Sequence, residues 1–238
     1  FTKRFFKDKP DVILYSSPHL FGFLSAKYLA KRWGSKLVFE VRDIWPLSIV
    51  EIGKVSPRNP IIVVMQWIED WAYAKADHVI SNLEFAVEHM VSRNMARGKF
   101  SWISNGVSLH EVYTSAPLQA DLQDFFLDGK FRLVYAGTLG EANAVHTLIE
   151  AAAYLHDLEG CNILIVGQGR SQNKLQARCA ELKLENVKFV GYLPKEKIFS
   201  FLKNADATYI GFLKNSIYRF GVSPNKLFEY LIIGKPII

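Results

Sequence analysis

Short, largely apolar runs alternate along this chain with longer stretches in which apolar residues recur every three or four positions. The first pattern is typical of strands buried on both faces, and the second of helices that pack one face on a core. The β-branched run at 61–64 is predicted to be helical, because Ile61, Val64 and Ile68 recur at helical spacing. Before residue 107, the other predicted elements are strands at 11–17, 36–43, 77–82 and 99–106, and helices at 19–33 (closed by Gly34) and 83–94.

The alternation pauses over residues 107–130 and then resumes. The polar stretch ADLQD and the preceding Pro117 predict a connector over residues 116–130. Beyond it, strands are predicted at 131–137, 162–167, 187–191, 207–212 and from 235, and helices at 144–158, 171–183, 194–205 and 223–234. Strands that alternate with helices form parallel sheets covered on both faces. We therefore predict an α/β protein with two Rossmann-like domains, residues 1–115 and 131–238.

The amino-acid composition restricts the class to which the protein can belong and the partners that it can bind. Of the 238 residues, 50% are hydrophobic and 22% are charged, as in folded, soluble proteins. The net charge of +6 suits an anionic membrane surface or a phosphorylated ligand, but it is too dispersed to favour nucleic acid. No apolar run reaches the roughly 18 residues of a membrane-spanning helix. Cys161 and Cys179 lack a CxxC spacing, which argues against a disulfide scaffold and predicts a reducing cytoplasm.

In α/β sheets of this kind, ligands bind at the carboxyl ends of the strands. Gly167 and Gly169 lie there, but the third position of a dinucleotide fingerprint is Gln172, which argues against an NAD site. A tight strand-to-helix turn is favoured, and a glycine turn that lets the backbone approach another ligand stays open. The six histidines show no metal-ligand spacing, and no G-x-S-x-G elbow surrounds the loop SSPH.

The closing stretch GVSPNKLFEYLIIGKPII joins a polar loop to an apolar helix. Ser223 suits the N-cap of that helix and Pro224 suits its first turn. Free N–H groups and the positive end of the helix dipole attract anions there, and Lys226 adds a full charge. Glu229, inside the apolar run, needs hydrogen-bond donors, and a ribose diol offers two. A capped helix without a ligand is the alternative.

The ordered set of motifs resembles glycosyltransferase family 4, the retaining enzymes with the GT-B fold. The resemblance rests on FRLVYAGTLGEANAVHTLIEAA, ILIVGQGRSQNKLQ, ENVKFVGYLPKEKI, NADATYIGF and YRFGVSPNKLFEYLIIGKPII, and earlier on FEVRDIWPLSIVEIG, WAYAKADHVISN and WISNGVSL. Within the family, the chain is similar to bacterial O-antigen and capsule transferases, including N-acetylfucosamine transferases. The resemblance implies a GT-B architecture of two Rossmann-like domains facing a cleft. It also implies truncation at both ends, because family members have a strand and glycine-rich loop before Asp11 and further helices after Ile238.

For the second domain, the resemblance implies a nucleotide-sugar site. Glu229 corresponds to the glutamate that holds the nucleotide ribose, whereas Gly221 replaces the glutamate that faces the donor sugar. The positions of the family's two diphosphate-binding cations fall near Thr138 and Asn143, so we expect Lys226 and Arg219 to bind the diphosphate instead, with Arg170 as the weaker candidate. The expected donor-binding residues are Glu229, Lys226, Asn225, Ser223, Arg219, Gly137, Thr138, Gly167 and Gly169.

For the first domain, the resemblance implies a catalytic role after the second predicted strand, where many members carry a histidine. Arg42 is expected to steady the leaving phosphate and Asp43 to orient an acceptor hydroxyl. In the alternative interpretation, Asp43 caps a turn and Arg42 is its ion-pair partner.

The resemblance therefore implies transfer, with retention, from a nucleotide-diphosphate-sugar, expected to be UDP-linked, to a lipid-linked saccharide of a bacterial surface polysaccharide. No metal or other cofactor is expected, because no DxD-type carboxylate pair lies in a strand-end loop. A cytoplasmic location is expected, with FTKRFFKDK touching anionic headgroups. Two alternatives stay open: a sugar-nucleotide epimerase, against which Gly221 argues, and a non-catalytic binding module.

Overall fold

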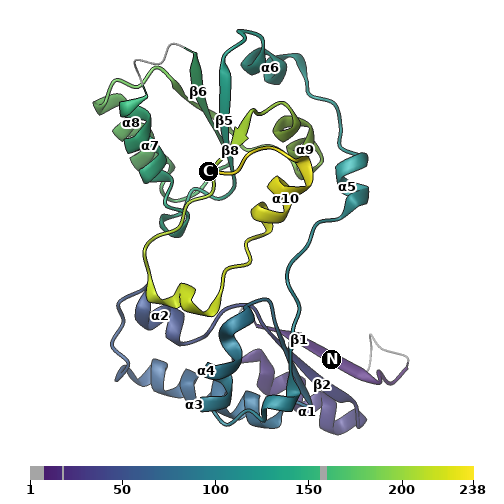
Figure 1. Cartoon of the computed structure of the whole chain (residues 1–238). Helices are drawn as coiled ribbons and strands as arrows, with labels where there is room; N and C mark the ends of the chain where they lie inside the picture. The colour runs from purple at the N-terminus through teal and green to yellow at the C-terminus, as the bar shows by residue number, and fades with distance from the viewer. Residues whose placement is uncertain (1–7, 18, 156–159) are drawn as a thin grey trace. The chain divides into compact units, whose positions relative to one another are not determined.

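The computed structural model describes residues 8–17, 19–155 and 160–238, and the chain forms two units (Figure 1). Unit 1 comprises Phe1–Asn105 and Asn215–Ser223, and unit 2 comprises Gly106–Lys214 and Pro224–Ile238. The expected membrane contact in FTKRFFKDK falls mainly on residues 1–7, outside the described residues.

Unit 1 is built on a parallel sheet with the strand order β1-β2-β3-β4, which confirms the predicted α/β pattern. Each strand pairs in register with the next, as Val12 does with Lys36 and Val38 with His78. The strands are β1 (Val12–Ser16), β2 (Lys36–Val41), β3 (His78–Ser81) and β4 (Phe100–Trp102). The helices are α1 (Gly22–Trp33), α2 (Leu47–Glu51), α3 (Pro60–Lys75) and α4 (Val87–Ser92), with single 3₁₀ turns η2 (Glu84–Ala86) and η3 (Arg97–Lys99).

Local sequence explains the two long helices of unit 1. Helix α1 ends at Gly34, which has φ 63°, a conformation that glycine adopts without strain. Helix α3 begins after Asn59, whose side chain accepts a hydrogen bond from the Ile61 N–H at 2.9 Å. The β-branched run is thus helical, as predicted, but Ile61 and Val64 are exposed, and the helix buries Ile62, Met65 and Ile68 instead.

Unit 2 is built on a second parallel sheet, with the order β7-β6-β5-β8. Its strands are β5 (Phe131–Ala136), β6 (Cys161–Val166), β7 (Val187–Gly191) and β8 (Ala207–Thr208). Its helices are α5 (Leu109–Tyr113), α6 (Ala120–Gln123), α7 (Val145–Tyr154), α8 (Gln172–Glu181), α9 (Lys195–Lys203) and α10 (Asn225–Ile233), with 3₁₀ turns η4 (Asp124–Phe126) and η5 (Glu141–Asn143). The predicted strand over 207–212 shortens to two residues, and the one predicted from 235 is only a bridge between Thr208 and Ile237.

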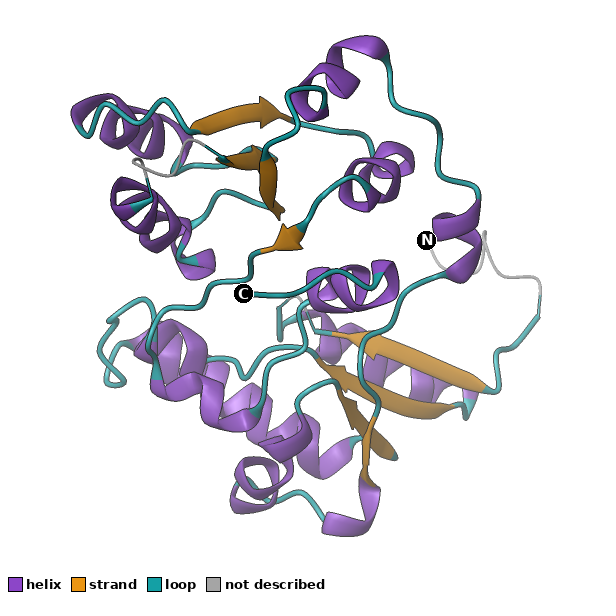
Figure 2. Cartoon of the chain, turned by 45° about the horizontal axis from the view of Figure 1, so that its top comes forward, coloured by secondary structure: helices purple, strands orange, loops and turns teal. Residues whose placement is uncertain are grey.

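Both faces of this second sheet are buried. Leu133 and Tyr135 pack on one face with α7 and α8, whereas Val134 and Ala136 pack on the other with α9 and α10. Alternate residues of a strand point to opposite faces, so an apolar run with helices on both sides follows from the sequence pattern. Figure 2 shows the strands and helices of each unit.

The boundary between the units differs from the predicted connector. The chain enters unit 2 at Gly106, and residues 116–130 form part of that unit. Leu122 is buried in its core, and Phe126 packs edge-on against Phe201, with 4.9 Å between the ring centroids. Most of the large apolar residues of this segment pack on unit 2, although Leu127 stays exposed, so its polar appearance in sequence hides a packed element.

Candidate functional site

Two glycine turns meet at the carboxyl ends of β5 and β6. The Leu139 N–H donates to the carbonyl of Gln168 at 3.0 Å. A Cβ on Gly167, which has φ 128°, would lie 1.9 Å from the carbonyl oxygen of Gly137, and one on Gly169 would lie 2.4 Å from that of Leu139. Both glycines are thus required by the close approach of the two turns, which accounts for them without a dinucleotide site.

A pocket of about 390 Å³ opens between these turns and the end of β7. Residues of three successive strand ends and of α9 line it: Gly137, Thr138, Val166, Gly167, Gln168, Tyr192, Leu193 and Ile198. The position matches the carboxyl edge at which doubly wound sheets bind their ligands.

Lys226, in the first turn of α10, reaches the turn after β5. Its Nζ donates to Asn143 Oδ1 at 2.6 Å and to the Tyr135 hydroxyl at 3.1 Å, and it lies 4.7 Å from the centroid of the Tyr135 ring. A Cβ added to Gly137 would lie 3.1 Å from Nζ, so the turn at Gly137 leaves room for the ammonium group. The structure thereby brings together Lys226, Gly137 and Thr138, whose carbonyl accepts from the Tyr135 hydroxyl at 2.7 Å.

The ammonium group of Lys226 is partly shielded from water. Burial lowers its pKa to about 8, although the nearby carboxylate of Glu229 acts in the opposite direction. At neutral pH the group is still charged, but its hydrogen-bond partners, Asn143 and Tyr135, are neutral. A partly buried charge whose hydrogen-bond partners are all neutral is stabilised when an anion binds beside it.

Glu229 follows Lys226 by three residues on the same side of α10 and is half-buried. Burial raises the pKa of its carboxyl, against the effect of Lys195 and Lys226, and Glu111 raises it further. Within the described ranges, no backbone or side-chain group donates a hydrogen bond to this carboxylate. It is therefore open to the donors of a ligand.

The start of α10 differs from the prediction in its cap. The N-cap residue is Pro224, no side chain caps the helix, and Asn225 is the first helical residue. The Ser223 hydroxyl instead accepts the N–H of Asn105 at 3.2 Å. The prediction that Ser223 caps the helix is wrong, because Asn105, far away in sequence, takes its oxygen. The first N–H groups of α10 consequently lack a side-chain cap.

Arg219 is placed differently from the other predicted donor-binding cations. It belongs to unit 1, where its two terminal nitrogens donate to the Glu51 carboxylate at 2.9 and 3.0 Å. This pairing lowers the pKa of Glu51. Because its charge is already neutralised by a carboxylate, Arg219 is no free cation for a diphosphate.

Arg42 and Asp43 follow β2 in unit 1, and both are exposed. Partial burial of the Asp43 carboxyl raises its pKa, and the charge of Arg42 lowers it. In the part of the chain that the structure describes, the two side chains form no ion pair with each other, and Asp43 caps no N–H. The structural alternative for this pair is thus not observed.

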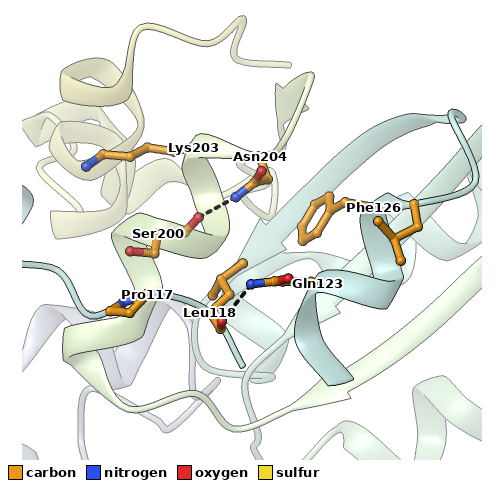
Figure 3. A pocket seen from close by; sticks show the side chains of 8 residues that line it. Pro117, Leu118, Gln123, Phe126, Ser200, Lys203 and Asn204 are labelled. Atoms are coloured by element: carbon orange, nitrogen blue, oxygen red, sulfur yellow. Dashed lines mark hydrogen bonds between the residues drawn. The ribbon is translucent and has the colours of Figure 1, made fainter. Parts of the chain in front are cut away.

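A further pocket, of about 470 Å³, lies between residues 117–127 and α9 (Figure 3). Its polar side chains are paired with neighbouring backbone: Gln123 donates to the carbonyl of Leu118 at 2.9 Å, and Asn204 to that of Ser200 at 2.8 Å. Lys203 donates to the carbonyl of Val112 at 3.0 Å. This pocket therefore offers a ligand few free polar groups.

The described residues contain no group of three or more His, Cys, Asp or Glu side chains placed to hold a metal ion. None of their helices combines the length and the apolar character that crossing a bilayer requires.

Comparison with known proteins defines the class. Crystal structures with the GT-B glycosyltransferase fold are similar to the chain. One is Anabaena Alr3699/HepE in complex with UDP, with a TM-score of 0.70 and 17% identity over 94% of this chain and 58% of that one. Another is WaaG, a glycosyltransferase involved in lipopolysaccharide biosynthesis, with a TM-score of 0.66 and 13% identity over 94% of this chain and 66% of that one. The fold is that of GT-B glycosyltransferases.

The family follows from sequence. Residues 1–111 match the family model for Glycosyltransferase Family 4, and residues 121–238 match that for Glycosyl transferases group 1. The chain thus carries one glycosyltransferase domain of each kind. It is 23% identical over 231 residues to the Escherichia coli (strain K12) protein named "Putative colanic acid biosynthesis glycosyl transferase WcaI". The match covers 95% of this chain but only 56% of that protein.

Proposed function

We propose that the chain forms the nucleotide-sugar site of a retaining glycosyltransferase that uses a UDP-linked donor. The observation that carries this proposal is that one face of α10, at the carboxyl end of β5, presents a half-buried cation, Lys226, and a half-buried carboxylate, Glu229, to which no group of the described residues donates a hydrogen bond. A nucleoside diphosphate needs both a positive group and a hydrogen-bond acceptor. The structure of Anabaena Alr3699/HepE in complex with UDP supports this choice of ligand by analogy of fold.

Each part of the site has a proposed role. The diphosphate lies over the uncapped start of α10, where Lys226 and the helix N–H groups meet it. The ribose hydroxyls donate to Glu229, and the base enters the 390 Å³ pocket beside Gly167. Asn225 offers its backbone N–H in the same first turn. Gly137 and Thr138 form the facing wall, with Gly169 supporting the turn from behind.

In this proposal, the chemistry is electrostatic. The site stabilises the charge that develops on the departing phosphate, without a covalent nucleophile and without a bound metal. Arg42 and Asp43 of unit 1 are the proposed catalytic residues, for the leaving phosphate and the acceptor hydroxyl. The proposed acceptor is a lipid-linked saccharide of a bacterial surface polysaccharide. The protein would act in the cytoplasm, at the inner face of the membrane.

Titration of the purified chain with UDP, in a calorimeter, tests the donor site. We expect saturable binding of UDP and weaker binding of uridine, because uridine lacks the diphosphate that meets Lys226. A chain that binds neither ligand would contradict the proposal. Incubation of the full-length enzyme with radiolabelled UDP-sugars and a lipid extract then separates the reaction classes: a labelled lipid means transfer, an epimerised nucleotide sugar means an epimerase, and neither means a binding module.

Arg42→Ala and Asp43→Ala are expected to lower kcat of the full-length enzyme while leaving the Kd for UDP nearly unchanged, because their roles are confined to the transition state. A positioned acid–base group contributes about 100- to 10,000-fold in rate. Initial rates and calorimetric titrations measure the two quantities. Arg58→Ala, an exposed arginine of the same unit, is the matched control. Normal kcat in both test variants would remove these residues from the mechanism.

A further inference from the structure

The segment Asn215–Ser223 leaves unit 2 after Lys214 and belongs to unit 1. The chain returns to unit 2 at Pro224, the only residue between this segment and α10. We propose that the segment, here called the strap, is anchored in unit 1 in order to position the start of α10 for nucleotide binding. Glu51 and Asn105 are the proposed positioning residues. The inference rests on the proposed function, because it concerns the same helix.

Glu51, at the end of α2, holds the first part of the strap. Its carboxylate accepts both terminal nitrogens of Arg219, at 2.9 and 3.0 Å, and also the hydroxyl of Ser216. Its backbone carbonyl accepts the side-chain amide of Asn215 at 3.4 Å. Single surface ion pairs contribute little, but bidentate pairs within a network are the exception. Glu51 binds three strap residues at once, so it is a specific anchor.

Apolar side chains fix the middle of the strap. Ile217 and Phe220 are 9% and 7% exposed and form part of the core of unit 1. The Phe220 ring packs edge-on against His89, with 5.4 Å between centroids, and the Arg219 guanidinium lies 4.3 Å from its centre. This part of the strap, the 3₁₀ turn η6 (Ser216–Phe220), lies beside α2 (Figure 1). Its apolar side chains are buried in unit 1, whereas Ser216 and Arg219 stay exposed.

Asn105 holds the end of the strap. Its backbone N–H donates to the Ser223 hydroxyl at 3.2 Å, and its side-chain amide donates to the Ser223 carbonyl. Just before, Gly221 adopts φ 101°, and a Cβ there would lie 3.3 Å from the backbone nitrogen of Glu84. The strap is thus held to unit 1 up to its last residue, Ser223.

The anchoring of the strap affects the ligand site because it limits fraying of the first turn of α10. A helix start without a side-chain cap frays, and Ser223 cannot cap because Asn105 engages it. The donor site needs that turn in place, since its N–H groups and Lys226 act together. Anchoring the residue before Pro224 restricts fraying and leaves the N–H groups free for a phosphate. Strap attachment and nucleotide binding are thereby linked, and each stabilises the other.

Hydrogen–deuterium exchange of the ligand-free chain tests this link, with Glu51→Gln as the variant. Its matched control is Glu88→Gln, which breaks the pair that Glu88 forms with Arg97, at 2.6 and 2.7 Å, also in unit 1. We expect Glu51→Gln to speed amide exchange about fivefold in the strap and in α10 from Leu227 onward, where the amides are hydrogen-bonded (the Leu227 N–H donates to the Pro224 carbonyl at 3.0 Å), the size of effect that an anchoring ion pair produces. The control should match wild type in both segments. Faster exchange in the strap alone, or in neither segment, would overturn the proposal.

UDP titration supplies a second readout. Glu51→Arg is expected to weaken UDP binding by up to about fivefold, and the double variant Glu51→Arg with Arg219→Glu is expected to restore it by re-forming the pair with reversed charges. Failure of the double variant to recover, in a folded protein, would count against the anchor. If the wild-type chain does not bind UDP, the proposed function fails, and the exchange rates of α10 still decide whether the strap positions that helix.

Discussion

Lys226→Met is expected to weaken UDP binding by about 10- to 150-fold, because a hydrogen bond to a charged group contributes about 1.5–3 kcal/mol. Methionine keeps an apolar stem over the Tyr135 ring and removes only the charge and its donors. Uridine should bind the variant and the wild type with equal affinity, because it has no diphosphate that could contact Lys226. Calorimetric titrations with both ligands measure the difference.

The same variant is expected to have a higher Tm. Burial lowers the pKa of Lys226 to about 8 in the folded protein, below its ordinary value. The folded state therefore loses stability as the pH falls from the ordinary pKa through about 8, and the full cost is present at neutral pH. Methionine removes this cost. Lys188→Met, an exposed lysine of β7, is the control and should change neither Tm nor affinity. Equal losses for UDP and uridine would refute the assignment of Lys226.

The charge of Lys226 also predicts a pH profile in the wild-type protein. UDP affinity should be nearly constant from pH 7 to about 8 and should fall above it, as the ammonium group deprotonates. Above the pKa of Lys226, the affinity for UDP can fall by at most tenfold per pH unit, and it falls this steeply only if Lys226 stays protonated in the complex. The phosphates of UDP are already ionised over this range, so they add no slope. In Lys226→Met the fall should disappear.

Local patterns in the sequence predicted the elements of both units well. Helix α3 was predicted from the spacing of Ile61, Val64 and Ile68, and the helix is confirmed, but of these three only Ile68 is buried. The buried face also contains Ile62 and Met65, so the spacing predicted the element and not its inward face. The strand predicted from residue 235 is present only in a short form. It lies parallel to β8 as a single bridge, Thr208 to Ile237, with the Thr208 N–H donating to the Pro236 carbonyl and the Ile238 N–H to the Thr208 carbonyl, both at 2.8 Å.

The candidate site was predictable only in part, because several of its features depend on partners far away in the chain. Ser223 and Arg219 carry the right chemistry for a helix cap and a phosphate, but Asn105 and Glu51 engage them across 118 and 168 residues. Tyr135, the partner of Lys226, ends a strand in sequence and gives no local signal of its role. Lys226 and Glu229 were found because their own turn of α10 contains the whole pattern.

Glu229→Ala is expected to weaken UDP and uridine binding by a similar factor, about 10- to 150-fold, which is the reverse of the selectivity expected for Lys226. The reason is that a carboxylate facing the ribose acts on the part that the two ligands share. Glu229→Gln keeps one acceptor oxygen, so we expect a smaller loss. Titrations of the three proteins with both ligands measure these factors, and Glu185→Gln, an exposed glutamate of unit 2, is the control.

Stability provides the independent check on Glu229. Burial raises the pKa of its carboxyl above the ordinary value of 4.5, so the folded protein holds a proton that the unfolded chain has already released. Stability then falls as the pH rises from 4.5 through the raised pKa. Glu229→Gln should therefore raise Tm at pH 7 and leave it nearly unchanged below pH 4.5. A residue that weakens the fold and strengthens ligand binding is the signature of a site kept for function. Wild-type affinity in a folded Glu229→Ala protein would leave α10 as a helix without a ribose partner.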